Sequence, residues 1–582
     1  MSYRPRFDPN IWLLLALSVF AWAPLLTPVH FLNAHDARHS IFYLVEFDQT
    51  WRDGYLWPRW SPDFAFGYGY PLFNLYAPLA IYAAEILHLA GLSFVAAIKA
   101  MYILATVAAG LGMAGFGQRL FGRRAGLLAG VAYMYVPFHL AEIFVRSAFA
   151  EFVALAVVPF LFWAFTELIA APSPRRAALA GVMYGLLALV HLTSFFTFSP
   201  FLMVYILFLI IAKSKVNGRR FIHRASYALA AGILGLALAA IYLLPLLTEA
   251  RFVKVEQWTS GSYNYLQHFV YLAQFFSPDW GYGYSGLGLQ DDFSFQLGIV
   301  FLVLTMAALV NIMARRFAHY STALFFLIST IVVVLLMSSL AEPIWRIVPI
   351  ATLVQFPWRL LAMTAFTMSI VIASLLAPTN LQSPTSPPPS PDPKSQIPNP
   401  KSPLYLLCLI IILASFAYTL PQYTAVPTWA ETPLAVINWD RGSITDRVGM
   451  VSVTLEQPQT SPMEAEYLAS GRPNTVAGII SGQGTVETLH HGGASDVIRV
   501  TAPERVTVQF YTYDYPGWQV TRDGQPLAHR HEPPFGLVTI DLPAGEHTVT
   551  LAMGATLPRT LGIIVTGLAL LLIVLIFLVR SI

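Results

Sequence analysis

Charged side chains are scarce in this sequence of 582 residues, of which only 11% are Asp, Glu, Lys or Arg and 56% are hydrophobic. A soluble domain carries about 25% charged residues, so a water-soluble protein of this size would have nowhere to place so much apolar surface. The apolar residues form runs close to the ~20 residues that cross a bilayer, and in lipid such runs must be helical. The scarcity of charge therefore excludes a soluble fold and predicts a polytopic membrane protein.

Cysteine is almost absent as well. The single Cys408 lies in an apolar run, which excludes a disulfide framework and a cysteine-based zinc site. The formal net charge of +3 points to no particular partner. We expect the lipid bilayer as a partner and no nucleic acid. The first apolar run, 11–29, lacks a small-residue cleavage site, so we expect a retained first helix rather than a signal peptide.

Basic residues set the expected topology, because cytoplasmic loops of membrane proteins are enriched in Arg and Lys. All basic clusters fall on one side if twelve helices alternate and the apolar stretch 71–92 does not span. We therefore place 71–92 on the outer face as interfacial or re-entrant helices, and both termini on the cytoplasmic side of a bacterial inner membrane. The expected spans are 11–29, 97–117, 125–138, 152–171, 177–196, 198–212, 226–247, 293–313, 320–340, 353–377, 404–421 and 558–580.

The expected helices divide the chain into parts. Residues 1–377 form a multi-helix transmembrane module with outer loops 30–96 and 248–292. A cytoplasmic linker over 378–403 is rich in Pro and Ser, which cannot build a core. One helix (404–421), an outer domain (422–557) and a last helix (558–582) complete the chain.

The outer domain changes its hydrophobic period. Val506, Val508 and Phe510 alternate with polar residues, which is typical of half-buried strands. Asp523-Gly524 is a strong hairpin-turn dipeptide. Several short strands with regular turns predict a β-sandwich outside the membrane.

The first outer loop carries candidate site residues. Asp36, beside His35, follows the first helix directly, at the bilayer surface. A carboxylate there can bind a divalent cation or remove a proton from an acceptor hydroxyl. Arg and aromatic side chains suit phosphate and sugar, and the loop offers Trp57, Arg59 and Tyr70. The alternative is that these residues only decorate a water-exposed loop.

Two more groups of candidates follow. Glu142 and Arg146 are one helical turn apart and can simply pair, but ionisable residues at membrane depth, Glu151 included, are functional candidates. His191 lies near an outer helix end, where a lone His is more often structural. Arg359 could hold a lipid phosphate, or it could snorkel beside an interfacial tryptophan.

These residues resemble a known group of proteins. The order of the motifs resembles the glycosyltransferase-C superfamily of membrane enzymes, and more closely the bacterial membrane proteins called "6-pyruvoyl-tetrahydropterin synthase-related". The name of this family implies no pterin chemistry here, since no His-based zinc motif is visible. The matching pieces are His35-Asp36, Trp57-Pro58-Arg59-Trp60, the run GYGYPLFNLYAPL, Arg146 with Glu151, His191, and FPWR at 356–359.

The resemblance implies a membrane glycosyltransferase that takes sugar from a polyprenyl-phosphate-linked donor and gives it to a glycan, lipid or protein acceptor. Asp36 matches the first acidic position of the superfamily, and Glu142 or Glu151 could match the second. Asp36 would be the general base or the ligand of a Mg or Mn ion. No Asp-x-Asp follows the first helix, so metal dependence stays open. Substrate would be bound by His35, Trp57, Arg59, Tyr70, Arg146, His191 and Arg359.

Two other functions compete with glycosyl transfer. A transporter or flippase for envelope components would need polar residues near the bilayer midplane, but the later helices over 293–340 have almost none inside. A non-catalytic envelope protein could use its β-sandwich to bind carbohydrate, with Trp518, Tyr511, Tyr513 and Tyr515 stacking on sugar. Such aromatic residues more often pack a sandwich core.

Overall fold

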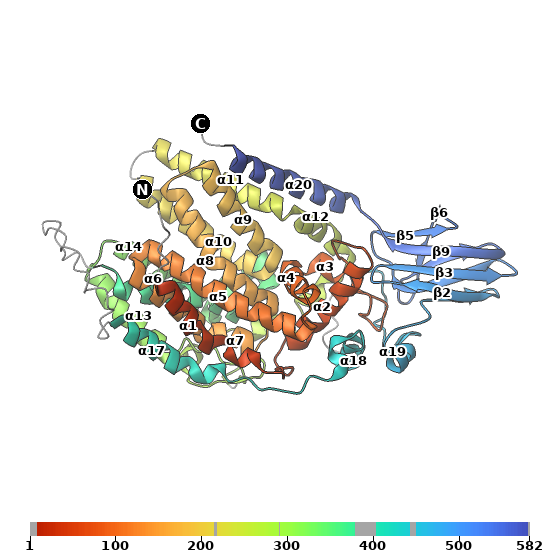
Figure 1. Cartoon of the computed structure of the whole chain (residues 1–582), viewed down its shortest axis with the longest axis horizontal. Helices are drawn as coiled ribbons and strands as arrows, with labels where there is room; N and C mark the ends of the chain where they lie inside the picture. Colours follow the sequence, from red (N-terminus) through yellow and green to blue (C-terminus); the bar gives the residue numbers. More distant parts are fainter. Residues whose placement is uncertain (1–8, 215–217, 290, 379–402, 443–449, 580–582) are drawn as a thin grey trace.

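The computed structural model describes residues 9–214, 218–289, 291–378, 403–442 and 450–579. Its helices form one elongated body, and β-strands project from one end of that body (Figure 1). The last helix, α20 (Leu557–Leu578), runs from the base of the strands along the helical body. The chain therefore combines a helical membrane body with a β region that is joined to it at both ends.

Eight helices of the described residues are long and apolar enough to cross a membrane. A ninth span results if the bent pair α6 (Arg123–Tyr135) and α7 (Pro137–Phe144), which meet at 43°, is counted as one. The eight are α1 with its 3-10 extension (Pro9–Leu26), α5 (Phe94–Phe121), α8 (Phe149–Ala170), α10 (Leu192–Ser214), α11 (Gly218–Leu238), α14 (Tyr320–Met337), the segment Pro357–Leu376 with α16 (Leu361–Ala373), and α20.

The count differs from the twelve spans predicted, and the reason is local. Each predicted span coincides with a helix, but four of these helices are too short to meet the same criterion on their own. A proline begins α7 and breaks the third predicted span, because the ring removes a backbone donor. The other three short helices are α9 (Pro174–Val190), α13 (Ile299–Met313) and α17 (Pro403–Ser415).

The apolar stretch 71–92 forms only short helices. These are α3 (Leu72–Leu75) and α4 (Leu79–Leu89), which has 11 residues. A helix of that length rises about 16 Å, roughly half of a bilayer core. The stretch packs instead against α2 (Ala37–Arg52), the helix of the first outer loop. This geometry is consistent with a segment that does not span.

The β region consists of two antiparallel sheets with the strand orders β1-β4-β8-β7 and β2-β3-β9-β5-β6. Apolar side chains from both sheets, such as Val508 and Val549, belong to one buried cluster. Asp523 and Gly524 both have positive φ and form the two-residue turn between β5 and β6, which confirms the predicted hairpin. The strands are β1 (Ala477–Ser481), β2 (Thr485–His491), β3 (Ser495–Ala502), β4 (Val506–Tyr513), β5 (Trp518–Arg522), β6 (Gln525–Leu527), β7 (Arg530–Glu532), β8 (Leu537–Leu542) and β9 (Gly545–Met553).

The remaining helices lie around the two bodies. Among them, α18 and α19 connect the membrane body to the β region and lie beside its base (Figure 1). Their bounds are α12 (Ala240–Glu249), α15 (Glu342–Ile347), α18 (Leu434–Gly442) and α19 (Glu464–Ser470).

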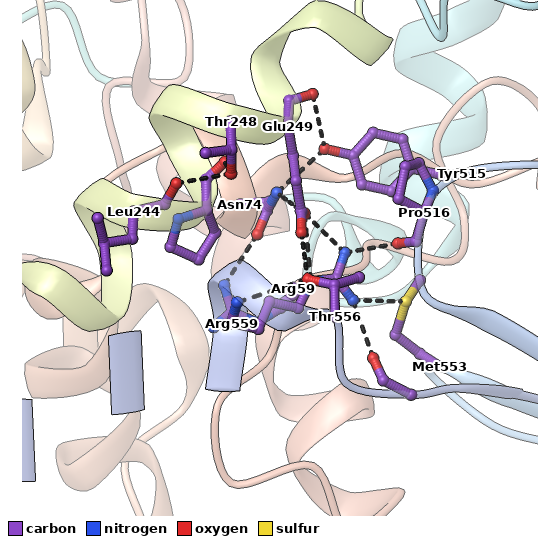
Figure 2. Close-up of polar contacts among 12 residues, drawn as sticks. Arg59, Asn74, Leu244, Thr248, Glu249, Tyr515, Pro516, Met553, Thr556 and Arg559 are labelled. Atoms are coloured by element: carbon purple, nitrogen blue, oxygen red, sulfur yellow. Dashed lines mark hydrogen bonds and ion pairs between the residues drawn. The ribbon is translucent and has the colours of Figure 1, made fainter. Parts of the chain in front are cut away.

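A buried polar network, called the junction cluster below, joins the β region to the helices (Figure 2). It consists of Arg59, Asn74, Glu249, Tyr515 and Arg559, all at most 8% exposed. Glu249 accepts from Arg559 Nη2 at 2.9 Å and from Asn74 Nδ2 at 2.6 Å. Asn74 in turn accepts from Arg59 Nη1 at 2.8 Å. The cluster ties the first outer loop, α12, the strand region and α20 together.

A second contact fixes the β2–β3 hairpin to the end of α2. Asp53 accepts hydrogen bonds from the backbone N–H of Ala494 and the hydroxyl of Ser495, both at 2.9 Å. Gly493 approaches Thr50 so closely that a Cβ there would lie 2.4 Å from the Thr50 Cα. The hairpin is therefore fitted to the first outer loop and holds the β region in one orientation.

Candidate active site

One cavity of about 650 Å³ lies where the membrane body meets the outer segments. Parts of the chain that are far apart in sequence line it: the start of α2, the α7–α8 turn, the loop 248–292, the FPWR segment, α18 and the end of β4. A cavity of this size and mixed lining is the usual place for a small-molecule site. We therefore take it as the candidate active site.

The α7–α8 turn brings the first outer loop to the cavity. The backbone N–H of Asp36 donates to the Arg146 carbonyl at 2.7 Å, and that of His35 donates to the Val145 carbonyl at 3.2 Å. Ser147 follows with φ of 50°, a left-handed conformation that a non-glycine residue adopts only under constraint. Buried Ser147 shares a hydrogen bond with the Tyr102 hydroxyl at 3.1 Å. The strained turn thus places Asp36 and Arg146 side by side.

A buried ion cluster lies against the cavity wall. Arg146 Nη1 pairs with Glu142 Oε1 and, at 2.9 Å, with Glu151 Oε2. All three side chains are at most 5% exposed. Arg359 extends the cluster, since its Nε lies 3.7 Å from the same Glu151 oxygen. Burial of charges is costly unless they are paired, so these four groups stabilise one another at the edge of the bilayer.

Two polar atoms of this ion cluster can still form hydrogen bonds. Within the described ranges, Glu142 Oε2 and Arg359 Nε are buried atoms without a hydrogen-bond partner. The Arg359 side chain is 14% exposed and faces the cavity, while its Nη1 is held by the Val354 carbonyl and the Gln355 side chain. The Arg146 guanidinium lies 4.7 Å from the ring centre of Trp358. The result is a rigid wall with two guanidinium groups, called the arginine wall below, that can meet an anionic ligand.

Asp36 is the accessible carboxylate of the site. Its side chain is 44% exposed and lines the cavity, whereas Glu142 and Glu151 are buried. The nearest ionic partner of its carboxylate within the described residues is His39, whose Nδ1 lies 3.9 Å from Oδ1. A carboxylate that is open to a cavity and held by its backbone can accept a proton from a bound hydroxyl.

His35 connects the site to the second outer loop. Its Nε2 lies 2.7 Å from the Gly283 carbonyl and 3.3 Å from that of Tyr282, and its ring stacks on Tyr284 at 4.3 Å. Carbonyls accept only, so Nε2 carries the proton. Burial lowers the pKa of His35, and neighbouring Arg146 adds to this against the opposing effect of Asp36. His35 is therefore a neutral hydrogen-bond donor that holds the loop 281–284 against the start of α2.

The structure brings most of the predicted site residues together. Glu142 lies directly behind Arg146 and outside the cavity lining. Arg59 and Trp57 lie elsewhere: Arg59 belongs to the junction cluster, and Trp57 packs against Tyr82 with ring centres 5.2 Å apart. The predicted residues that line the cavity are His35, Asp36, Tyr70, Arg146, Glu151, His191 and Arg359.

Sequence reasoning missed several residues of the cavity. Trp439 and Asp440 from α18 line it, although they lie about 400 residues after Asp36, and no local pattern marks them. Tyr513 of β4 lines it as well, whereas the sequence suggested this residue only as one that could stack on sugar in the outer domain. His268 had a weak signal, as a histidine in a Tyr- and Gly-rich outer loop, and it bonds to Ser285 Oγ at 2.7 Å and the Ser262 carbonyl at 2.8 Å. The β region and α18 therefore complete a site that the membrane body begins.

The described residues around Asp36 offer few ligands for a metal ion. Among the described residues, no group of three or more His, Cys, Asp or Glu side chains is placed to hold a metal ion. His35 turns its Nε2 to two carbonyls, and His39 is the remaining candidate beside Asp36. A magnesium ion can be held by one or two carboxylates together with substrate phosphate and water, so Asp36 as a ligand of a Mg or Mn ion stays a prediction. No step of the chemistry below depends on a metal ion.

Comparisons with known proteins give a family and distant structural likenesses. Residues 73–426, more than half of the chain, match the family model described as 6-pyruvoyl-tetrahydropterin synthase related domain, membrane protein. An uncharacterized protein of Lactococcus lactis subsp. cremoris is 26% identical over 220 residues, which are 37% of this chain and 34% of that protein.

Two solved structures are distantly similar to the chain. The oligosaccharyltransferase of Archaeoglobus fulgidus is 14% identical at a TM-score of 0.45, over 79% of this chain and 59% of that chain. The arabinofuranosyltransferase AftD from Mycobacteria is 12% identical at a TM-score of 0.47, over 96% of this chain and 42% of that chain. The chain thus spans about a third to three fifths of the lengths of these relatives. Such distant likenesses do not assign an activity, which has to follow from the residues of the site.

Proposed function

The chain belongs to the 6-pyruvoyl-tetrahydropterin synthase-related membrane proteins, and we propose that it is a glycosyltransferase of the membrane surface. It takes a sugar from a polyprenyl-phosphate-linked donor and gives it to the hydroxyl of an acceptor outside the cytoplasm. The acceptor is a glycan, a lipid or a protein side chain. The observation that carries this proposal is the meeting of one accessible carboxylate, Asp36, with the arginine wall in a cavity at the end of the membrane helices.

Asp36 acts as the general base. Its carboxylate removes the proton of the acceptor hydroxyl as that oxygen forms a bond to the anomeric carbon of the donor sugar. The bond between this carbon and the phosphate oxygen breaks, and its electron pair stays on the leaving phosphate. The proton ends on Asp36, so the step needs no further reactant.

Arg359 and Arg146 stabilise the leaving phosphate. Negative charge grows on the phosphate oxygens as the bond breaks, and fixed cations in a water-poor site stabilise such charge well. Glu142 and Glu151 hold Arg146 in place, and Glu151 also lies 3.7 Å from Arg359. These two glutamates are therefore positioning residues in the proposal, and His191, which lines the same cavity, contacts the donor.

The lipid part of the donor explains the position of the cavity. An isoprenoid chain stays in the bilayer, so its phosphate and sugar reach only the membrane surface, where Asp36 and Arg359 meet. The outer segments supply the opposite wall, on which Trp439 and Tyr513 face the acceptor. With the basic clusters on the cytoplasmic side, the cavity and the β region lie outside the cytoplasmic membrane of a bacterium.

Transfer of labelled sugar in proteoliposomes tests the proposal. Protein reconstituted with a polyprenyl-phosphate-linked sugar is expected to label an acceptor, and Asp36→Asn is expected to abolish labelling without loss of folded protein. Glu256→Gln, which removes an exposed carboxylate of the loop 248–292 outside the cavity, is the matched control. Full activity of Asp36→Asn would refute the base, and movement of labelled solute without transfer would indicate a transporter instead.

A further inference from the structure

The second outer loop, 248–292, is joined to the arginine wall by a chain of hydrogen bonds. His268 and Ser285 of this loop line the cavity, as does Trp358 of the FPWR segment. His268 Nδ1 lies 2.7 Å from Ser285 Oγ, and Trp358 Nε1 donates to the same oxygen at 2.9 Å. The other end of the chain is the Ser262 carbonyl, 2.8 Å from His268 Nε2. We call this series of contacts the loop chain.

The direction of each hydrogen bond in the loop chain follows from the end at Ser262. A carbonyl only accepts, so His268 Nε2 carries the proton and Nδ1 is an acceptor. Nδ1 therefore accepts from the Ser285 hydroxyl, whose oxygen accepts in turn from the Trp358 indole, which only donates. Burial lowers the pKa of His268, which favours this neutral form. One arrangement of hydrogens thus satisfies every member of the chain.

Contacts within the loop fix the position of the loop chain. The Asp291 carboxylate accepts from the backbone N–H of Gly286, next to Ser285, at 2.6 Å. Its other oxygen accepts from the Gln274 side chain at 2.7 Å. His268 is only 5% exposed, so its two hydrogen bonds are shielded from competing water. The position of Ser285 is therefore set by the loop.

The Trp358 ring supports the guanidinium of Arg146. The ring centre lies 4.7 Å from the Arg146 Cζ, and both residues are at most 4% exposed. Glu142 and Glu151 bind Arg146 at Nη1, whereas the ring supports the face of the guanidinium. Such a contact between a cation and an aromatic ring is strongest where water is excluded. A change in the tilt of the ring would therefore let the guanidinium shift.

We propose that the loop chain positions Arg146 for the leaving phosphate: Ser285 and His268 orient Trp358, and Trp358 orients Arg146. This inference rests on the proposed function, in which Arg146 stabilises the phosphate as the sugar departs. Ser285, His268 and Trp358 act through Arg146 and are positioning residues. Arg146 is in its working position only while the loop is docked on Trp358, so the second outer loop completes the arginine wall.

Single-turnover transfer from a polyprenyl-phosphate-linked sugar tests the loop chain in the full-length protein, at equal amounts of folded protein. Ser285→Ala removes the acceptor of the Trp358 N–H and should lower kcat about fivefold, with an unchanged KM for the acceptor. Ser285→Thr keeps the hydroxyl and should restore kcat. Ser277→Ala is the matched control, because this serine of the same loop bonds to Asp279 and lies outside the cavity lining.

Double variants test whether Ser285 acts through Trp358. Trp358→Phe keeps an aromatic ring and loses the N–H donor, so adding Ser285→Ala to it should cost no further activity. Added to Arg359→Gln, Ser285→Ala should still lower kcat about fivefold, because Arg359 is held separately by the Val354 carbonyl and the Gln355 side chain. The same additional loss in both backgrounds would mean that Ser285 only stabilises its loop, and would overturn the inference.

Binding of a polyprenyl phosphate without sugar separates this inference from the proposed function. Native mass spectrometry should show about fivefold weaker binding to Ser285→Ala than to Ser285→Thr and the parent protein. That pattern without any sugar transfer would refute the transferase and keep the loop chain, whereas transfer with an unchanged kcat in Ser285→Ala would do the reverse. A parent protein that neither transfers sugar nor binds the lipid phosphate would refute both. Covalent labelling of Ser285 by a fluorophosphonate would mean that His268 activates a nucleophile, and would also overturn the inference.

Discussion

The candidate active site and the junction cluster are built from the same residue types. They differ in how many of the hydrogen bonds that these side chains can form are made within the protein. Both contain two arginines and buried glutamate. In the junction cluster, Glu249 accepts from Arg559, Asn74 and Thr556, so its carboxylate has no capacity left (Figure 2). At the active site, Glu142 Oε2 and Arg359 Nε keep unused capacity, and Asp36 opens to a cavity. Saturated charges hold a fold together, whereas unsaturated charges beside a cavity can act on a ligand.

The largest expected effect is a loss of activity without a loss of stability, which would distinguish the active site from the junction cluster. Asp36→Asn should lower kcat about a hundredfold or more, because a general base contributes at least that much. Its melting temperature should stay close to that of the parent protein, because the Asp36 side chain is 44% exposed and the side chain of its ionic partner His39 is 23% exposed. Single-turnover transfer and thermal unfolding in detergent measure the two effects. A large drop in melting temperature would mean that Asp36 stabilises the fold, as the junction cluster does, rather than acting on a ligand.

Breaking the junction cluster should have the opposite effect. Glu249→Leu strands Arg559, whose side chain is 3% exposed, and should lower the free energy of unfolding by about 3–5 kcal/mol. The double variant Glu249→Leu/Arg559→Leu should recover part of this loss, because no lone charge stays buried. Chemical unfolding of purified protein measures both. An unchanged stability in the single variant would mean that the cluster does not hold the β region.

A substitution of Arg359 tests whether the arginine wall binds the donor. Arg359→Gln should raise KM for the lipid-linked donor about tenfold, because a charged hydrogen bond to phosphate contributes about 1.5–3 kcal/mol. Arg359→Lys keeps the charge and should give an intermediate KM, since Lys lacks the forked guanidinium. A fall in stability with an unchanged KM would instead make Arg359 an interfacial anchor.

The smallest effect concerns a pair of neighbouring carboxyl groups, Glu46 and Asp63, within the first outer loop. Burial, and then neighbouring Asp63, raise the pKa of Glu46 well above its usual range. The unfolded chain ionises Glu46 above about pH 4.5 while the folded chain keeps it protonated, so its contribution to stability is present below that pH and declines as pH rises.

Glu46→Gln should therefore melt a few degrees higher than the parent protein at pH 8, with little difference at pH 4.5. Thermal unfolding over this pH range measures the change. Glu504→Gln, at an exposed position of the β region, should leave the pH profile of melting unaltered. An identical profile in Glu46→Gln and the parent protein would contradict the assignment.

The sequence predicted the parts of the site that depend on topology. Asp36 follows the first helix, and Arg359 begins a later one, so counting helices and basic clusters places both at one membrane surface. The choice between Arg59 and Arg359 could not be made in this way. Both lie beside tryptophan in similar motifs. Only the structure shows that the buried Arg59 guanidinium donates a hydrogen bond to Asn74 and so belongs to the junction cluster.

Long-range contacts account for the rest of what the sequence did not reveal. Trp439 and Tyr513 reach the cavity because α18 and β4 fold back over the first outer loop, and no periodicity encodes that return. Amino-acid composition also could not predict where the helices begin and end. The apolar run near 125–138 bends at Pro137, and the run that begins near 293 becomes helical only at Ile299. Apolar content locates a segment, but backbone geometry decides how much of it is helix.

The fit of the β2–β3 hairpin against α2 has a consequence for attempts to exchange parts between relatives. Gly492 and Gly493 leave no room for side chains where they meet Asp53 and Thr50. A β region transplanted from a homologue would carry a hairpin shaped to a different helix and would sit askew over the cavity. Functional chimeras should therefore inherit residues 30–70 and 434–553 as one unit, although some 360 residues separate these segments in the chain.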